Sequence, residues 1–352
     1  MPAKKPQLEE IAKSFAHSAV HEFRGSSPHY ERLAMGISRD PAMLTLASYA
    51  ISQPVPMIFL AAVHYLLLNG AAHSLAAMYP DINPELCPTE ADPYPFFRDF
   101  CFQHQEEVKN LIATHHVQTN EVRRCACLLP AFCIVAKQAQ GLPLALVEIG
   151  ASAGLNLLWD CYGYDYGNGN IHGNGTSPVQ LTCSLRGDKR PPFPETFPQI
   201  ASRIGIDLNP IDVRDQSAVN WLSAFIWPEH TARFDLLHRA IEIARNNPPE
   251  LHKGDILECL PRIMETMPRE TLLCLFHTFV SNQMSQETGD GLEKLITDYG
   301  SKRDICCISI DLSDTYKYPR LELLSYIDGA KIHRHLANCS GHSRWLEWLE
   351  PI

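Results

Sequence analysis

Residues 144–160 read LALVEIGASAGLNLLWD, and this stretch decides the fold of the chain. Leu144 to Ile149 form an apolar run that Glu148 alone interrupts, as in a strand that is buried on both faces. A glycine turn follows from Gly150 to Gly154, and apolar residues then recur at helical spacing. The stretch therefore predicts a strand, a tight turn and a helix, with backbone N–H groups beside a carboxylate.

One chemistry that suits this turn is nucleotide binding. Small residues would let the backbone approach the ligand, and Glu148 would accept hydrogen bonds from ribose hydroxyls or from an ammonium group. The pattern resembles the first motif of the S-adenosylmethionine-dependent methyltransferases, acid-x-Gly-x-Gly-x-Gly, with Ser152 in place of the middle glycine. The cofactor-binding residues expected from this stretch are Glu148, Gly150, Ser152, Gly154 and Asn156.

A second interpretation is that Gly-x-Ser-x-Gly forms the nucleophile elbow of a serine hydrolase, with Ser152 as the nucleophile. An acid and a histidine would then follow in the chain, and the candidates are Asp255, Asp311, His333, His335 and His342. The context argues against this interpretation, because an elbow normally follows several strands and the chain before residue 144 reads as helical. A purely structural glycine turn is the third interpretation.

Composition limits the classes of function. The net charge of −10 and the absence of a long Lys/Arg run exclude a nucleic-acid surface as the main function. No apolar run reaches membrane-spanning length, and the start of the chain lacks the apolar core of a signal peptide. We therefore expect a cytoplasmic protein without a membrane partner, whose 12 cysteines are reduced thiols. Their spacing fits no zinc site, so no metal is expected.

Residues 1–140 predict a helical N-terminal region on the substrate side, ahead of a Rossmann domain at 141–352. Within it, the polar run 118–124 precedes an apolar helix. Thr119 or Asn120 can cap that helix, and Glu121 suits its first turn. The run carries more polar groups than one cap needs, so it equally predicts a substrate site, whose residues would be Gln118, Thr119, Asn120, Glu121 and Arg124.

Beyond the glycine turn, strands alternate with helices, which indicates a parallel sheet with right-handed crossovers. Residues 179–185 read as the second strand and residues 204–213 as a further short extended segment. Later strands are expected at 272–277 and 305–311. Residues 321–327 and 331–337 flank Asp328-Gly329, which is a strong signal for a β-hairpin. The fold class is therefore α/β, with a methyltransferase-like Rossmann sheet and a C-terminal hairpin.

Three further positions are candidates for the site. Asp207 is the nearest acid that could replace a ribose-binding carboxylate, because the expected second strand ends near Ser184. Gly254-Asp255 resembles the acid that faces the adenine ring in methyltransferases, although the pair is also a common turn. His277 ends a predicted strand and is the candidate base, with Thr278 to orient an acceptor. A histidine that simply packs at a strand end is an equally good interpretation of His277.

The chain also resembles, over nearly its whole length, a bacterial and fungal family known as a domain of unknown function. The matching segments are SPHYERLA (27–34), QTNEVRRCACLLP (118–130), LVEIGASAGLNLLWDCYGY (146–164), GIDLNPIDV (205–213), WPEHTAR (227–233), GDILECL (254–260) and FHT (276–278). The resemblance implies a methyltransferase-like Rossmann fold behind a helical region. In the methyltransferase topology, the final strand inserts antiparallel into the sheet.

These observations predict a protein that binds S-adenosylmethionine and acts on a small molecule. Glu121 and His277 are the candidate catalytic residues. The alternatives are a serine hydrolase that uses Ser152 and a non-catalytic ligand-binding protein on the same fold. The sequence leaves the methyl acceptor and the oligomeric state open.

Overall fold

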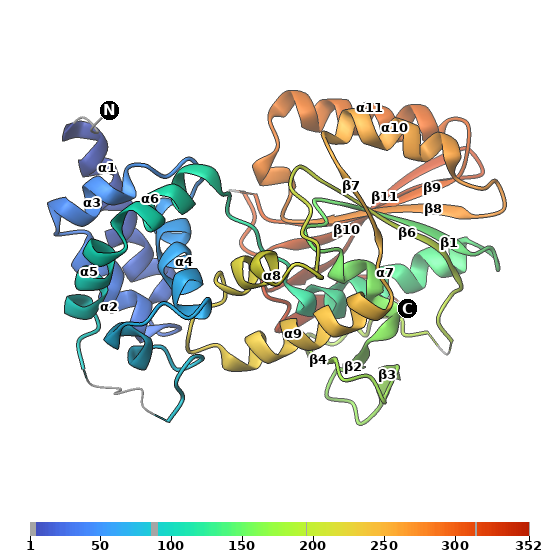
Figure 1. Ribbon diagram of the computed structural model, residues 1–352. Helices are drawn as coiled ribbons and strands as arrows, with labels where there is room; N and C mark the ends of the chain where they lie inside the picture. Colours follow the sequence, from blue (N-terminus) through green and yellow to red (C-terminus); the bar gives the residue numbers. More distant parts are fainter. Residues whose placement is uncertain (1–4, 86–90, 195, 314, 352) are drawn as a thin grey trace. The chain divides into compact units, whose positions relative to one another are not determined.

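The computed structural model describes residues 5–85, 91–194, 196–313 and 315–351 (Figure 1). The chain divides into two compact units. The first comprises residues 1–119 and 214–237, and the second comprises residues 120–213 and 238–352. Whereas the sequence suggests a boundary near residue 140, residues 120–140 belong to the second unit. A short segment, 214–237, returns to the first.

The first unit is helical. Its elements are α1 (Lys5–Ser18), η1 (Ala19–Phe23), α2 (Pro28–Ile37), α3 (Pro41–Ala47), α4 (Val55–Leu68), η2 (Ser74–Met78), α5 (Tyr94–Gln103), α6 (Gln105–Thr114) and α8 (Gln216–Ser223). Two of these helices begin at residues whose side chains cap them. The Ser27 side chain accepts from the N–H of Tyr30, and Asp40 caps α3 through the N–H groups of Ala42 and Met43.

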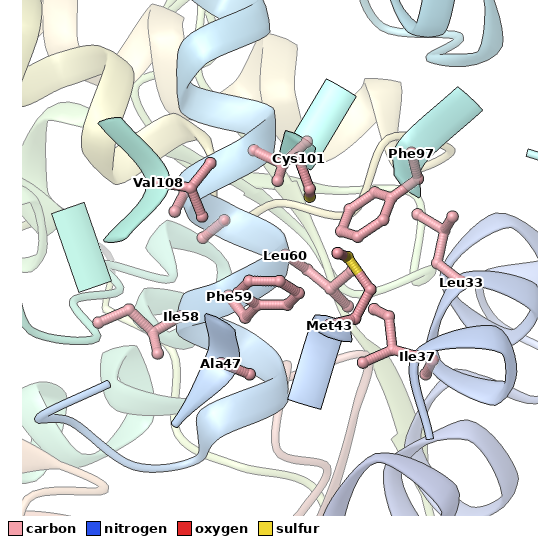
Figure 2. Packing of buried hydrophobic residues seen from close by; sticks show 14 of the residues in the cluster. Leu33, Ile37, Met43, Ala47, Ile58, Phe59, Leu60, Phe97, Cys101 and Val108 are labelled. Carbon is pink, nitrogen blue, oxygen red and sulfur yellow. The ribbon is translucent and has the colours of Figure 1, made fainter. Parts of the chain in front are cut away.

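The core of this unit surrounds α4, which is apolar on every side (Figure 2). Phe59 packs edge-to-face against Phe15 and Phe97, with ring centroids 6.0 and 5.8 Å apart. Burial on all sides explains why this run is so apolar despite its 14-residue length. Among the described helices, none has the length and apolar character that crossing a membrane requires.

The second unit is α/β. Its helices and turns are η3 (Val122–Arg124), α7 (Cys125–Gln138), η4 (Leu155–Cys161), α10 (Ile256–Thr266), η5 (Ser281–Gln283) and α11 (Gln286–Gly300). Its strands are β1 (Leu144–Ile149), β2 (Gly163–Asp165), β3 (Ile171–Gly173), β4 (Gln180–Thr182), β5 (Ser184–Arg186), β6 (Ile200–Asp207), β7 (Glu250–Lys253), β8 (Leu272–Thr278), β9 (Ile305–Asp311), β10 (Arg320–Ile327), β11 (Ala330–Cys339) and β12 (Trp345–Trp348). Helix α9 (Thr231–Asn246) begins in the first unit and ends in the second.

A nine-stranded sheet organises this unit in the order β5-β12-β11-β10-β9-β8-β1-β6-β7. The strands from β7 to β9 are parallel. From β1 the chain first adds β6 and β7 on one side, and then crosses to add β8 and β9 on the other. The direction of winding therefore reverses between β1 and β8, and ligands of open α/β sheets bind outside the carboxyl ends of strands at such a point.

The expectation for the second strand of the sheet is wrong. Residues 179–185 are not its second strand. They contain β4, which belongs to a separate three-stranded sheet with β2 and β3, and the start of β5, which pairs with β12 at the far edge. The strand beside β1 is β6, so Ser184 is not the position at which a ribose-binding acid would be sought.

The hairpin at residues 320–339 is confirmed, but it does not insert a strand into the sheet. Asp328 and Gly329 both have positive φ, 50° and 75°, as a type I′ turn requires. Strand β10 pairs antiparallel with β9, and β11 follows on its outer side. The sheet thus ends in a simple antiparallel series, and the methyltransferase arrangement with an inserted final strand is absent from these described strands.

Helices cover the parallel strands on both faces. Figure 1 shows α10 and α11 on one face and α7 on the other. The apolar cluster under α10 and α11 includes Val147, Ile149, Leu275 and Cys307. Because successive residues of a strand point to opposite faces, Glu148 and Thr278 belong to the α7 face, whereas His277 belongs to the α10 and α11 face.

Candidate functional site

The turn after β1 holds three residues in the left-handed region. Gly150, Ser152 and Gly154 have φ values of 68°, 51° and 69°. Glycine adopts this conformation without cost, so Ser152 is the strained member of the series. A Cβ atom at Gly150 would lie 2.6 Å from a methyl group of Val280, and one at Gly154 would lie 2.7 Å from Pro249. The two glycines thus make room for protein side chains at these points.

Glu148 is the most unusual residue at this edge of the sheet. It is only 1% exposed, and its Oε1 accepts from Asn156 Nδ2 at 3.1 Å. Its Oε2 is buried and has no hydrogen-bond partner among the described residues. Burial raises the pKa of Glu148 to about 8, although Asn156 and the charge of Arg124 act in the opposite direction. A buried carboxyl oxygen without a partner marks a place where a donor is missing.

Asp207 ends β6, the strand beside β1, and contacts the turn directly. Its Oδ2 accepts from the N–H of Ser152 at 2.8 Å, and its Oδ1 accepts from the N–H of Asn209 at 2.8 Å. The following residue, Leu208, is 63% exposed, which is unusual for a large apolar side chain beside a buried turn. The end of β6 therefore offers a carboxylate and an apolar surface side by side.

The polar run that precedes α7 contributes to the same edge. Asn120 Oδ1 accepts from the N–H of Leu155, the first residue of η4, at 3.1 Å. Glu121 is 8% exposed, accepts from the N–H of Arg123 at 3.3 Å, and lies 3.3 Å from Nδ1 of His342. The cap that Thr119 or Asn120 was expected to provide for α7 is not formed: Glu121 caps η3, and Asn120 accepts from the start of η4. The role of the run as a substrate site stays a prediction.

Arg124 connects this run to the end of β8. Its Nη1 donates to Thr278 Oγ1 at 3.0 Å, and its guanidinium lies over the ring of Phe279, 4.5 Å from the centroid. Phe279 has a φ of 58°, so a second non-glycine residue in the left-handed region stands at the end of the neighbouring parallel strand. Strained residues of this kind cluster at functional sites.

Most of the predicted site residues in the second unit therefore gather at the carboxyl ends of β1, β6 and β8, and two of them, His277 and Asp255, lie elsewhere. His277 points to the α10 and α11 face, so it is not on the side of the sheet that carries Glu148. Gln118 and Thr119 belong to the first unit. Asp255 is exposed and caps α10 by accepting from the N–H of Leu257 at 2.8 Å, the structural role weighed for it.

The serine-hydrolase arrangement is not assembled. Ser152 Oγ is buried and has no hydrogen-bond partner among the described residues. Of the candidate histidines, His333 lies 3.5 Å from Glu322 and His342 lies 3.3 Å from Glu121. A nucleophilic serine needs a base within hydrogen-bond reach. Within the described part of the chain there is also no group of three or more His, Cys, Asp or Glu side chains that could hold a metal.

The sequence does not predict the part that two residues play in this site. His342 is a candidate there only for a hydrolase, and it reaches Glu121 from a position far along the chain. Phe279 directly follows Thr278, but its part in the site depends on a positive φ and on the approach of Arg124. Cys125 is a small buried residue, and its thiol lies 3.3 Å from Asn156 Oδ1.

Comparison with known families places the chain in one of them. Residues 12–348 match the model of a family described as "Uncharacterized protein conserved in bacteria (DUF2332)". This match spans nearly the whole chain, so the chain belongs to that family. No curated protein matches it.

Replacing Ser152 by glycine should stabilise the protein by about 1 kcal/mol, because glycine removes the strain of the left-handed conformation and a buried hydroxyl without a partner. The shift of the urea unfolding midpoint measures this gain. Ser152→Ala is the matched control, since it removes the hydroxyl but keeps the strain. A glycine variant less stable than the alanine variant would contradict the strain argument.

Proposed function

We propose that this protein is an S-adenosylmethionine-dependent methyltransferase-like protein that acts on a small molecule. The observation that carries the proposal is Glu148 Oε2 at the carboxyl end of β1, a buried carboxyl oxygen for which the described part of the chain offers no hydrogen-bond partner. An unsatisfied group of this kind costs about 1–3 kcal/mol, more when it is charged. A ligand that donates an ammonium or hydroxyl hydrogen to Glu148 would remove that cost.

The position of Glu148 supports a nucleoside ligand. It stands where the order of the parallel strands reverses, the place where open α/β sheets bind nucleotides. On the neighbouring strand, Asp207 could accept from ribose hydroxyls while it holds the turn through Ser152. The exposed side chain of Leu208 offers an apolar surface for a flat base. The residues present thus fit the adenosyl group by the chemistry of their donors and acceptors.

The chain's own residues would then place and activate the methyl acceptor. When bound here, S-adenosylmethionine supplies an electrophilic methyl group. Arg124, fixed by Thr278 and Phe279, suits a carboxylate on the acceptor through paired hydrogen bonds. Glu121 replaces His277 as the better candidate base for a hydroxyl acceptor, because it lies on the Arg124 side of the sheet and His342 orients it. Methyl transfer itself depends mainly on proximity and alignment.

Isothermal titration with S-adenosylmethionine and S-adenosylhomocysteine tests the proposal. We expect both ligands to bind wild type and Glu148→Gln to weaken binding at least about tenfold, because the variant loses a charged acceptor. At pH 7 binding of the ligand's ammonium group should release a proton from Glu148, whose pKa is about 8, so the heat should depend on the buffer's ionisation enthalpy.

The control variant is Glu265→Gln, which changes an exposed acid at the end of α10 and should bind as wild type does. Absence of heat at millimolar ligand, or equal affinities of wild type and Glu148→Gln, would contradict the proposal.

A second candidate is a ligand-binding protein without turnover. It is favoured by the side chains of Val280 and Pro249, which fill the space in front of Gly150 and Gly154. Binding of S-adenosylhomocysteine without methyl transfer to any acceptor in a metabolite extract would favour this candidate.

A further inference from the structure

A separate cavity lies on the other face of the sheet, beside α11. Its volume is about 550 Å³, and it is lined by strands β8 to β11 and by α11 with the segment before it. Its walls include the apolar side chains of Met284, Leu292, Ile296 and Leu324, while Glu322 and Lys331 are among its polar residues. A cavity of this size and mixed character fits a small molecule.

Three chemically active side chains line this cavity together. They are His277 on β8 and both Cys307 and Asp311 on β9. In the parallel register His277 stands opposite Ser309, so Cys307 and Asp311 lie two residues before and two residues after its partner. Because side chains alternate along a strand, all three share one face, with His277 between the cysteine and the acid.

The acid and the imidazole form a buried pair. His277 is 7% exposed, and its Nδ1 lies 3.2 Å from Oδ2 of Asp311. Ser281 donates to that same Oδ2 at 2.9 Å and so fixes the carboxylate. Oδ1 of Asp311 is buried and has no hydrogen-bond partner among the described residues. With Nδ1 directed at Asp311, the other ring nitrogen of His277 is left for chemistry at the cavity.

Electrostatics agree with this arrangement. Burial alone lowers the pKa of His277, but Asp311 and the sulfur of Cys307 outweigh burial and raise it to about 10. A thiol beside an imidazolium is stabilised as the thiolate, which is the nucleophilic form of cysteine. Cys307 is 7% exposed and lines the cavity, whereas its neighbour Cys306 is fully buried against Gln138 and Ser325 on the opposite face.

We propose that Cys307, His277 and Asp311, placed side by side on β8 and β9 at this cavity, form a nucleophilic site that hydrolyses small acyl esters or thioesters. Cys307 is the nucleophile, His277 holds the proton and delivers it to the leaving group, and Asp311 is a positioning residue. The apolar wall of α11 and β10 receives the acyl chain. This site is independent of the methyltransferase-like site, since it lies on the other face of the sheet.

The reaction balances without any other reactant than water. The Cys307 sulfur reacts as the thiolate of a pair with the His277 imidazolium, and it attacks the acyl carbon to form an S–C bond. The bond from that carbon to the leaving alcohol or thiol breaks, and the leaving group takes the proton from His277. Water then attacks the thioester, gives one proton back to His277, and releases a carboxylic acid and the Cys307 thiolate.

The probe is p-nitrophenyl butanoate. The release of nitrophenolate measures its reaction with the protein, and mass spectrometry of peptides locates the acyl group. We expect a butanoyl group on Cys307 and a loss of about 100-fold in the rate of acylation for His277→Asn. Cys307→Ser should carry no label at this position. Cys306→Ser is the matched control and should acylate at the wild-type rate.

A second measurement does not depend on folding of the cysteine variant. The rate at which iodoacetamide alkylates Cys307 at pH 7 should fall about tenfold in His277→Asn, because this variant lacks the imidazolium beside the sulfur. Asp311→Asn should lower the rate as well. An absence of label on Cys307, or acylation and alkylation that His277→Asn leaves unchanged, would overturn the proposal.

Discussion

Glu148→Gln is expected to become progressively more stable than wild type as the pH rises from about 4.5 to about 8. The folded protein raises the pKa of Glu148 from 4.5 to about 8, so below 4.5 the carboxyl is protonated in both states and its full contribution to stability is present. Between these pH values the unfolded chain releases a proton that the folded chain retains. Wild type therefore loses stability with rising pH, by up to about 5 kcal/mol in total.

Urea unfolding of both proteins at pH 5, 6, 7, 8 and 9 measures this effect. The difference between the two free energies of unfolding should grow through this range and level off above pH 8, since glutamine has no charge to desolvate. Other titrating groups cancel in the difference. Glu265→Gln, which alters an exposed acid, should give a small and constant difference. A constant difference for Glu148→Gln as well would refute the raised pKa.

Removal of His64 should destabilise the helical unit by about 3–5 kcal/mol. Nε2 of His64 lies 2.7 Å from Oδ2 of Asp81, and the two side chains are 0% and 3% exposed. Nδ1 of His64 lies 3.1 Å from the carbonyl oxygen of Ala224. His64→Ala would leave Asp81 buried without its partner, in addition to opening a cavity in the middle of α4.

The second unit offers a control with the same contact distance. His252 Nε2 also lies 2.7 Å from a carboxylate oxygen, that of Glu250, but the two side chains are 38% and 66% exposed. His252→Ala should cost less than about 1 kcal/mol, because water screens an exposed pair. Thermal unfolding measures the loss of stability in both variants. Equal losses would show that burial does not control the strength of the His64 pair.

The parts of the fold that the sequence predicted are those with strong local signals. The apolar run of β1, the left-handed glycines after it and the Asp328-Gly329 turn each depend on a few neighbouring residues. The error at residues 179–185 has a physical cause. The alternation in VQLTCSL fits one strand, but β4 and β5 are separated at Cys183 and pair with different partners, and pairing depends on distant segments.

The sequence predicts which residue types belong to the candidate site, but it does not predict how their side chains are arranged in space. The sequence predicts Asp207 as a substitute for a ribose-binding acid, but its contact with the N–H of Ser152 depends on the pairing of β1 with β6. His277 and Thr278 are adjacent in the chain and face opposite sides of the sheet. Which side carries α7 cannot be read from local periodicity, so the sequence does not show that His277 and Glu148 lie on opposite faces.

The pairing of β5 with β12 has a consequence for how the protein is made. The outer edge of the large sheet joins residues 184–186 to residues 345–348, so one half of this ladder leaves the ribosome long before the other is synthesised. During that interval the backbone of β5 lacks the strand with which it pairs in this sheet. Only the polarity of its own segment then protects it from aggregation. Ser184 and Arg186 are exposed, and the charged residues Asp188, Lys189 and Arg190 follow. Polar and charged side chains of this kind disfavour the pairing of an open strand edge with other chains.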